Sequence, residues 1–378
     1  MILQSMWFWM VAHAQPCWEV RGKKQILAEM YPVLGYPGKL TIHGRIVREK
    51  QNFSLMDVIP KHDISVDERK KGTVSFFIGD EKIGSSSIDK EGWVRANIEK
   101  SFLPSEYEVQ VELEGCIIGT TSMRVLSPEY QGIVVRSDVD MTYLYTDFHS
   151  TSSILALLEQ SASQRKSIDG MAEFYQLLRD RSGHNRPLTF ISGSPVFFKR
   201  VLENKMRLDD VLHDEIVLKP FKALISKIGL GAIPLLKEQI GYKLDTLLRL
   251  RQQIPPNSQE VLIGDDTEAD PLIYALYAQL LRKEYSEEGL MKFLQEHDVS
   301  LYWQERIQEQ LPLFWSSLGE KSAVLAIFIH QTKEDTEEFA YWKNKKSIFF
   351  YRTVEDLKAR LLHSSWMHIE TEPKSAEE

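Results

Sequence analysis

The chain has 378 residues, of which 43% are hydrophobic, and a formal net charge of −8. The length predicts two domains, and the hydrophobic content is typical of a globular protein with a core. The negative charge argues against general nucleic-acid binding, which needs a basic face, but it allows a local phosphate pocket. The two cysteines, Cys17 and Cys116, exclude a disulfide scaffold and a cysteine-based zinc site. A single disulfide bond and two free thiols both remain open.

The first segment, residues 1–24, contains the apolar stretch Met6–Ala12, followed by Ala12-His13-Ala14. This small-x-small pattern is typical of a signal-peptidase site, although the usual preceding basic residues are missing. A signal peptide is therefore favoured over a Trp-rich interfacial anchor or a first structural segment. With a signal peptide the protein would be exported, and without one it would be cytoplasmic. No uninterrupted apolar run is long enough to span a bilayer.

The region from residue 25 to residue 128 predicts a small all-β sandwich domain. Short β-prone runs alternate with turn signals, and no convincing helical pattern occurs between them. The expected strands are Leu40–Val47, Thr73–Ile78, Trp93–Ile98, Glu106–Leu113 and Thr120–Val125. The segment Leu126–Gly132 carries both Pro and Gly, so we place the domain boundary there.

The region from residue 129 to residue 365 instead predicts strands that alternate with helices, which indicates a mostly parallel sheet with helices on both faces. The expected strands are Ile133–Val135, Leu188–Ile191, Val261–Ile263, Ala323–His330 and Ser347–Tyr351. The expected helices are Ser152–Ser161, Met171–Arg179, Pro195–Leu202, Ile240–Arg251, Pro271–Arg282 and Val354–Leu362. Residues 285–319 predict a helical insertion, and the polar tail, residues 366–378, is expected to be disordered.

Polar motifs follow three of these predicted strands. Asp138 and Asp140 follow the first strand, Ser192 follows the second, and Asp265 follows the third. Because the carboxyl ends of parallel strands lie at one edge of a sheet, we expect these residues to meet there. Lys243 precedes the third strand on a predicted helix, and its long side chain is expected to reach the same edge.

These residue types are suited to phosphoryl transfer. Several carboxylates in one place require a cation, so Asp138, Asp265 and Asp270 predict an oxygen-liganded Mg²⁺ site. Asp138 is suited to attack phosphorus, and Asp140 to protonate the leaving oxygen and then activate water. Ser192 and Lys243 would bind the phosphate, and Lys243 would also keep Asp138 ionised.

Each motif taken alone has a simpler interpretation. A lone Asp-x-Asp is more often a turn or a helix cap than a nucleophile, and Ser192 could cap the helix after Pro195. Lys219 competes with Lys243 for the lysine role. Whether Asp266 or Asp270 is the second acidic metal-site residue remains open. The combination and order of the motifs, however, are specific.

The order of motifs resembles the four-motif signature of the haloacid dehalogenase superfamily. More closely, SDVDMT, DGMAEFYQLLRD, PLTFISGSPVFF and VLIGDDTEADPLIY are similar to the catalytic domain of the actin-patch phosphatidate phosphatase family. The resemblance is clearest from Gly132 to Tyr274. It implies a Rossmann-like fold, Mg²⁺-dependent hydrolysis of phosphatidate or a related lipid phosphomonoester, and a metal bond from the backbone carbonyl of Asp140.

Three positions depart from the family pattern. Met141 stands where the family usually has a further acid, Gly193 replaces a common Asn, and Asp266-Thr267 replaces Ser-Gly. These departures leave the lipid specificity open. A phosphatase for a soluble phosphomonoester and a non-catalytic lipid- or protein-binding module with this fold are the alternatives. The partner is thus expected to be a phosphate-bearing substrate, such as a lipid at a membrane surface. The oligomeric state is not predicted.

Overall fold

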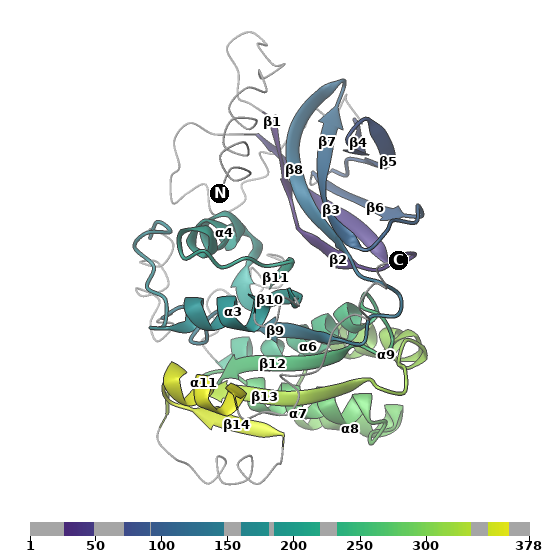
Figure 1. The fold of residues 1–378 in the computed structure, drawn as a ribbon. Coiled ribbons are helices and arrows are strands. Elements are labelled where there is room, and N and C mark those ends of the chain that lie inside the picture. Colours follow the sequence, from purple (N-terminus) through teal and green to yellow (C-terminus); the bar gives the residue numbers. More distant parts are fainter. Residues whose placement is uncertain are drawn as a thin grey trace, which may run out of the picture. The chain divides into compact units, whose positions relative to one another are not determined.

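The computed structural model describes residues 26–48, 72–90, 92–146, 160–180, 185–219, 233–333 and 347–362. Two compact units are present among these residues (Figure 1). The first contains residues 26–33 and 40–124, and the second contains residues 34–39 and the chain from residue 125 onwards. The predicted signal or anchor segment, most of the predicted helix Ser152–Ser161 and the predicted tail lie outside the described residues.

The first unit is built from β-strands. Its strands are β1 Ile26–Met30, β3 Leu40–Arg48, β4 Thr73–Ile78, β5 Glu81–Ser87, β6 Trp93–Ile98, β7 Ser105–Leu113 and most of β8 Cys116–Val125, and the short strand β2 Val33–Gly35 begins in it. They form a three-stranded sheet in the order β1-β3-β6 and a five-stranded sheet in the order β2-β8-β7-β4-β5. Burial alternates along β6 and β7, as expected of strands with one face on a core. Gly84 of β5 faces Ile98 of β6, so the two sheets pack against each other.

The short segment 34–39 groups with the second unit. Leu34 belongs to a buried cluster with Leu126, Tyr130 and Val134. The amide N–H of Leu126 also donates a 2.8 Å hydrogen bond to the carbonyl of Gly35. This packing explains why a segment so early in the chain belongs with residues that follow Arg124.

The second unit is a doubly wound α/β domain. Its strands are β9 Ile133–Ser137, β10 Leu188–Pro195, β11 Glu215–Lys219, β12 Gln259–Asp265, β13 Ala323–His330 and β14 Ile348–Tyr351. They form one sheet in the order β11-β10-β9-β12-β13-β14, and every adjacent pair is parallel. The chain builds outwards from β9 on one side and from β12 on the other. The point where this winding reverses, between β9 and β12, is where ligands bind in such sheets.

Helices cover both faces of this sheet (Figure 1). They are α3 Met171–Asp180, α4 Lys199–Leu208, α6 Ile233–Arg251, α7 Asp270–Leu281, α8 Glu287–Glu296, α9 Leu301–Ser316 and α11 Val354–Leu362, with a short 3-10 turn at Val196–Phe198. Adjacent residues of β10 point to opposite faces. The ring of Phe190 lies 5.2 Å from that of Tyr175 on α3, whereas Ile191 joins the core beneath α6 and α7.

The predicted helical insertion is helical, but it is part of the domain core. Leu290 and Leu294 of α8 and Trp303 and Ile307 of α9 are buried in the same cluster as strands β12 and β13. Gly241 permits the close crossing of α6 and α9, because an added Cβ would lie 2.5 Å from the side chain of Trp303. Within the described ranges, no helix combines the length and the apolar character needed to cross a bilayer.

A buried ion pair joins the two central strands. Arg136 on β9 contacts the carboxylate of Glu260 on β12 at 2.5 Å, and both side chains are almost completely buried. The Tyr277 hydroxyl donates to the same carboxylate at 2.7 Å, and Arg251 lies 3.6 Å from it. A buried carboxylate needs such partners, so Glu260 connects β9 and β12 to α6 and α7.

Candidate active site

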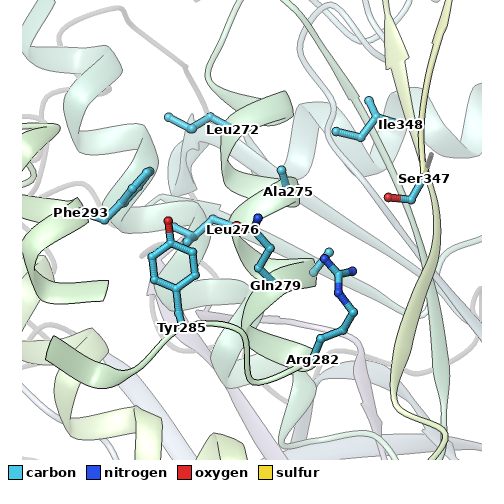
Figure 2. Close-up of a pocket in the computed structure, with 10 residues that line it drawn as sticks. Leu272, Ala275, Leu276, Gln279, Arg282, Tyr285, Phe293, Ser347 and Ile348 are labelled. Carbon is cyan, nitrogen blue, oxygen red and sulfur yellow. The ribbon is translucent and has the colours of Figure 1, made fainter. Parts of the chain in front are cut away.

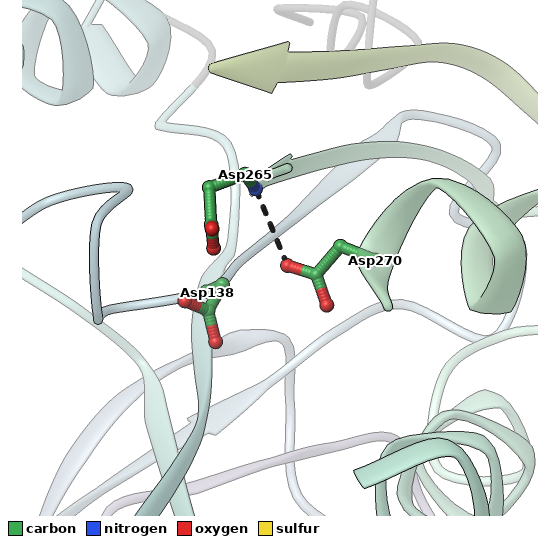
Figure 3. Close-up of side chains that lie close together, drawn as sticks. All are labelled: Asp138, Asp265 and Asp270. Carbon is green, nitrogen blue, oxygen red and sulfur yellow. Dashed lines mark hydrogen bonds between the residues drawn. The ribbon is translucent and has the colours of Figure 1, made fainter. Parts of the chain in front are cut away.

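Three aspartates converge at the carboxyl ends of β9 and β12 (Figure 3). Asp138 directly follows β9, Asp265 ends β12, and Asp270 begins α7. One carboxylate oxygen from each lies within 4.8 Å of the others, and all three residues are buried. The amide N–H of Asp138 donates to the carbonyl of Ile263 at 2.8 Å, so the sheet itself holds Asp138 beside the end of β12.

Lys243 lies at the centre of these carboxylates. Its Nζ is 2.8 Å from Asp138 Oδ1, 2.8 Å from Glu268 Oε2 and 2.5 Å from Asp270 Oδ1. Burial lowers the pKa of Lys243, but attraction to Asp138, Asp270 and Glu268 outweighs burial and raises it well above its usual value. By contrast, the Nζ of Lys219, the rival candidate, lies 5.8 Å from the ring centroid of Tyr242.

Two of the carboxylates would be hard to ionise in this setting. Burial raises the pKa of Asp138 well above its usual value, Lys243 opposes this, and Asp270 adds to it. Burial followed by repulsion from Asp270 and Glu268 raises the pKa of Asp265 in the same way. One ammonium is therefore not enough to balance the negative charges of the cluster.

The residues present fit a divalent cation. Asp138 Oδ2 and Asp265 Oδ2 are buried, and neither has a hydrogen-bond partner among the described residues. Because leaving such atoms unpaired costs free energy, they require a partner that accepts electron pairs. Carboxylate oxygens are the ligands that Mg²⁺ prefers. Asp138, Asp265 and Asp270 would hold the ion, and its extra positive charge would allow all three to ionise.

Replacing Asp265 tests this metal site directly. With saturating Mg²⁺ at about 100 times its dissociation constant, the wild-type protein should gain about 2.7 kcal/mol in unfolding free energy. Asp265→Asn should lose most of this gain, because it removes a charged ligand atom. Urea denaturation with and without Mg²⁺ measures both values. An undiminished gain in the variant would rule out Asp265 as a ligand.

The carboxylate of Asp140 has a different environment from that of Asp138. Ser192 Oγ and Ser194 Oγ each donate to Asp140 Oδ2 at 2.9 Å, and Thr146 Oγ1 donates to Oδ1 at 2.9 Å. Three hydroxyls thus orient this carboxylate, and its side chain is not one of the three in the cluster around Lys243. Ser192, which we expected to bind phosphate, positions Asp140 in this structure.

Asp266, the alternative second acidic ligand, is directed elsewhere. Its carboxylate accepts from the backbone N–H groups of Thr332 at 2.9 Å and Lys333 at 3.0 Å. Asp266 therefore joins the loop after β12 to the loop after β13, whereas Asp270 is the residue that lies with Asp138 and Asp265.

Several site residues were missed by sequence reasoning. Glu268 is the third carboxylate on Lys243, and Ser194 and Thr146 hold Asp140. Ser194 could have been found, since it lies two residues after Ser192 and side chains two apart in a strand share a face. His330 ends β13, and its Nδ1 lies 2.6 Å from the carbonyl of Met141. No local signal connects Thr146 to the site. Glu268, however, lies between Asp265 and Asp270 in the sequence, and His330 ends a predicted strand of the same sheet.

Met141 adopts a backbone conformation that is unusual for its residue type. Its φ is +58°, in the left-handed region, and its Sδ accepts a hydrogen bond from the Thr146 N–H at 3.4 Å. Asn and Asp tolerate this region better than Met does. The departure from the family pattern at this position therefore occurs at a strained turn beside Asp140.

Relieving this turn should stabilise the protein. Relief of the backbone strain in Met141→Asn is expected to raise the free energy of unfolding by about 0.5–1 kcal/mol. Loss of the weak hydrogen bond to the Met141 sulfur will offset part of this gain. Lys283→Asn, at a φ of +56° in another part of the domain, is a matched control with the same expected sign. Urea denaturation measures both changes. A lower midpoint for Met141→Asn alone would show that the Met side chain is needed at this turn.

A small cavity lies elsewhere in the second unit. It has a volume of about 180 Å³ and is lined mainly by α7 and by residues near α8 and β14, including Leu272, Gln279, Arg282, Phe293 and Ile348 (Figure 2). None of the aspartates or Lys243 lines it. The cavity is therefore separate from the carboxylate cluster.

A doubly wound parallel sheet with buried carboxylates and a lysine at its winding reversal defines an α/β domain with an acidic candidate active site. Residues 133–285 match the family model described as phosphatidate phosphatase APP1, catalytic domain. This match confirms the resemblance predicted from the motifs, over less than half of the chain. It includes Asp138, Ser192, Lys243, Asp265 and Asp270. The family description is that of a phosphatase, which is a hydrolase.

Curated proteins and solved structures give no further indication of the activity of this chain. No curated protein matches the chain. A β-glucuronidase from Ruminococcus gnavus is 8% identical, with a TM-score of 0.23, and the alignment covers 87% of this chain and 55% of that one. A glycosyl hydrolase family 2 member from Bacteroides cellulosilyticus is 11% identical, with a TM-score of 0.23 and coverages of 90% and 45%. The chain thus spans about half the length of these structures, and TM-scores this low support no argument about fold or activity.

Proposed function

We propose that this protein is a Mg²⁺-dependent phosphatase that acts on phosphatidate or a related lipid phosphomonoester through an aspartyl-phosphate intermediate. The observation that carries the proposal is the buried carboxylate of Asp138. Lys243 holds its Oδ1, and its Oδ2 is left without a partner beside Asp265 and Asp270. We also propose that the second unit belongs to the haloacid dehalogenase superfamily, on the order of its motifs.

In the first half of the reaction, one oxygen of the Asp138 carboxylate attacks phosphorus, and the bond from phosphorus to the substrate alcohol breaks. Asp140 acts as the general acid and gives a proton to the leaving oxygen. The three hydroxyls around Asp140 keep its carboxyl group oriented for this transfer. A bound Mg²⁺ would neutralise the phosphate charge that otherwise repels the attacking carboxylate.

In the second half, Asp140 accepts a proton from water as the water oxygen attacks the phosphorus of the aspartyl-phosphate. The bond between Asp138 and phosphorus breaks, inorganic phosphate leaves, and the Asp138 carboxylate is restored. Lys243 stabilises negative charge on Asp138 and on the phosphoryl oxygens throughout. These two half-reactions together hydrolyse the phosphomonoester, and neither step uses an organic cofactor.

The substrate class is tested by comparing phosphatidate in mixed micelles with a panel of soluble phosphomonoesters. Mg²⁺-dependent phosphate release from phosphatidate, with weak release from the soluble esters, supports the proposal. The reverse preference would identify a phosphatase for soluble substrates. A lack of release from the whole panel would favour a non-catalytic binding module.

A further inference from the structure

The carboxamide of Gln239, on α6, lies directly over Gly193 near the end of β10. A Cβ added at Gly193 would be 2.2 Å from Gln239 Nε2 and 2.6 Å from Oε1. Real Cβ atoms do not approach other heavy atoms so closely. Only the absence of a side chain at position 193 therefore leaves room for the carboxamide beside Ser192 and Ser194.

The orientation of this amide is set by Glu268. Gln239 Nε2 donates to Glu268 Oε1 at 2.8 Å, and the other oxygen of Glu268 contacts Lys243. An ionised carboxylate only accepts hydrogen bonds, so the amide nitrogen must face Glu268 and the amide oxygen must face away. Gln239 Oε1 is buried and has no hydrogen-bond partner among the described residues.

The neighbouring donors are already engaged. The hydroxyls of Ser192 and Ser194 donate to Asp140. The ammonium of Lys243 contacts three carboxylates. Since an unpaired buried acceptor costs on the order of 1–3 kcal/mol, this oxygen is placed to receive a donor from a bound molecule.

Gln239 lies at the outer edge of the site. Asp138 and Lys243 are completely buried, whereas Gln239, Gly193 and Glu268 are partly exposed. In a phosphomonoester with its phosphorus at the buried Asp138, the alcohol part would have to extend towards this more exposed edge. Ionised phosphate oxygens only accept hydrogen bonds, so the donor has to come from the alcohol part.

We propose that Gln239 Oε1 accepts a hydrogen bond from a free hydroxyl on the alcohol part of the substrate, and that Gln239 thereby determines specificity. The inference rests on the proposed phosphatase function and narrows its substrate class. The glycerol of phosphatidate has no free hydroxyl, because both are acylated, whereas the glycerol of lysophosphatidate has one. The two lipids therefore separate this contact from every contact to the phosphate.

The test compares wild-type protein with Gln239→Leu on both lipids in the same mixed micelles. The value of kcat/KM for lysophosphatidate should fall about tenfold, as expected for one lost hydrogen bond of roughly 1.4 kcal/mol. The value for phosphatidate should fall less than about twofold. Gly193→Ala, which displaces the carboxamide, should produce the same selective loss. Gln308→Leu is the matched control, because Gln308 makes the same amide-to-carboxylate contact with Glu287 at 2.7 Å on the surface.

Equal losses on both lipids would overturn the inference, because they would mean that Gln239 acts only by holding Glu268. Unchanged values for lysophosphatidate would overturn it as well. Calorimetric binding of the two lipids to Asp138→Asn protein, with and without Gln239→Leu, measures the contact without turnover. A selective loss of lysophosphatidate affinity there supports the contact even if the wild-type protein proves to lack phosphatase activity.

Discussion

Asp138→Asn should lower Mg²⁺-dependent phosphate release by at least about 10⁴-fold, because an amide cannot form the aspartyl-phosphate. The fold should be retained, since Asn has nearly the same shape as Asp and the backbone bond from Asp138 to Ile263 is unaffected. The loss should appear in kcat. Phosphate release under saturating substrate, together with circular dichroism of both proteins, measures the two effects.

Asp169→Asn is the control for this experiment, because Asp169 is exposed in the same domain. It should leave phosphate release within about twofold of the wild-type value. Acid quenching during turnover should also detect phosphorylated wild-type protein and no phosphorylated Asp138→Asn. An active Asp138→Asn protein would exclude Asp138 as the nucleophile.

Among the substitutions discussed for this protein, Lys243→Met should lower the free energy of unfolding the most. It removes the cation that lies between Asp138, Glu268 and Asp270, all within 2.8 Å of its Nζ. Breaking a buried ion pair in this way typically costs about 3–5 kcal/mol, because the remaining charges are buried and uncompensated. Saturating Mg²⁺ should restore part of this loss, so the variant should gain more stability from Mg²⁺ than the wild-type protein gains. Urea denaturation at several Mg²⁺ concentrations measures the difference.

Lys292→Met is the matched surface substitution. Lys292 lies 3.8 Å from Glu296, and both side chains are largely exposed. Its loss should change the unfolding free energy by less than about 0.5 kcal/mol. If Lys243→Met were as stable as Lys292→Met in the absence of Mg²⁺, the carboxylates of the cluster would be neutral, and the electrostatic account of the site would be wrong.

The elements that were predicted well have strong local patterns. Strands β4, β6 and β13 and helix α11 were predicted with the observed bounds. In β13, most of the eight residues are apolar and buried, as expected for a strand covered on both faces. Strand β5, in contrast, was missed. Its sequence EKIGSSS contains one buried apolar residue, Ile83, and pairing with β4 defines it as a strand.

Strand β11 was missed for a different reason. It is only five residues long, and it begins and ends with charged residues, Glu215 and Lys219, which are buried. The predicted helix Pro195–Leu202 shows a related limit. Strand β10 continues to Pro195 and α4 begins at Lys199, because pairing with β11 extends the strand past the Ser-Gly-Ser turn. The pairing of β10 with β11 therefore determines both the presence of β11 and the end of β10, and no local sequence pattern indicates this pairing.

Site residues that directly follow a predicted strand could be predicted from the sequence. Asp138 and Asp265 were placed by their strands, and parallel pairing brings them together. The hydrogen-bond partners of the site side chains were harder to predict. Hydrogen bonds from Thr146 to Asp140 and from Gln239 to Glu268 depend on loop paths and side-chain rotamers that periodicity does not encode. The functional roles assigned to Asp138, Asp140, Ser192, Lys243, Asp265 and Asp270 remain predictions.

The buried pair of Arg136 and Glu260 has a consequence for ion selectivity. It links β9 to β12 below the site, and strand pairing places Ser137 opposite Ile263 above it. The separation of the carboxylates that follow these residues is thus defined by a rigid sheet and not by loops. Mg²⁺ requires short, nearly fixed ligand distances, whereas Ca²⁺ accepts longer and more variable ones. In the proposed metal site, the rigid pairing of β9 and β12 is therefore expected to favour Mg²⁺ over Ca²⁺.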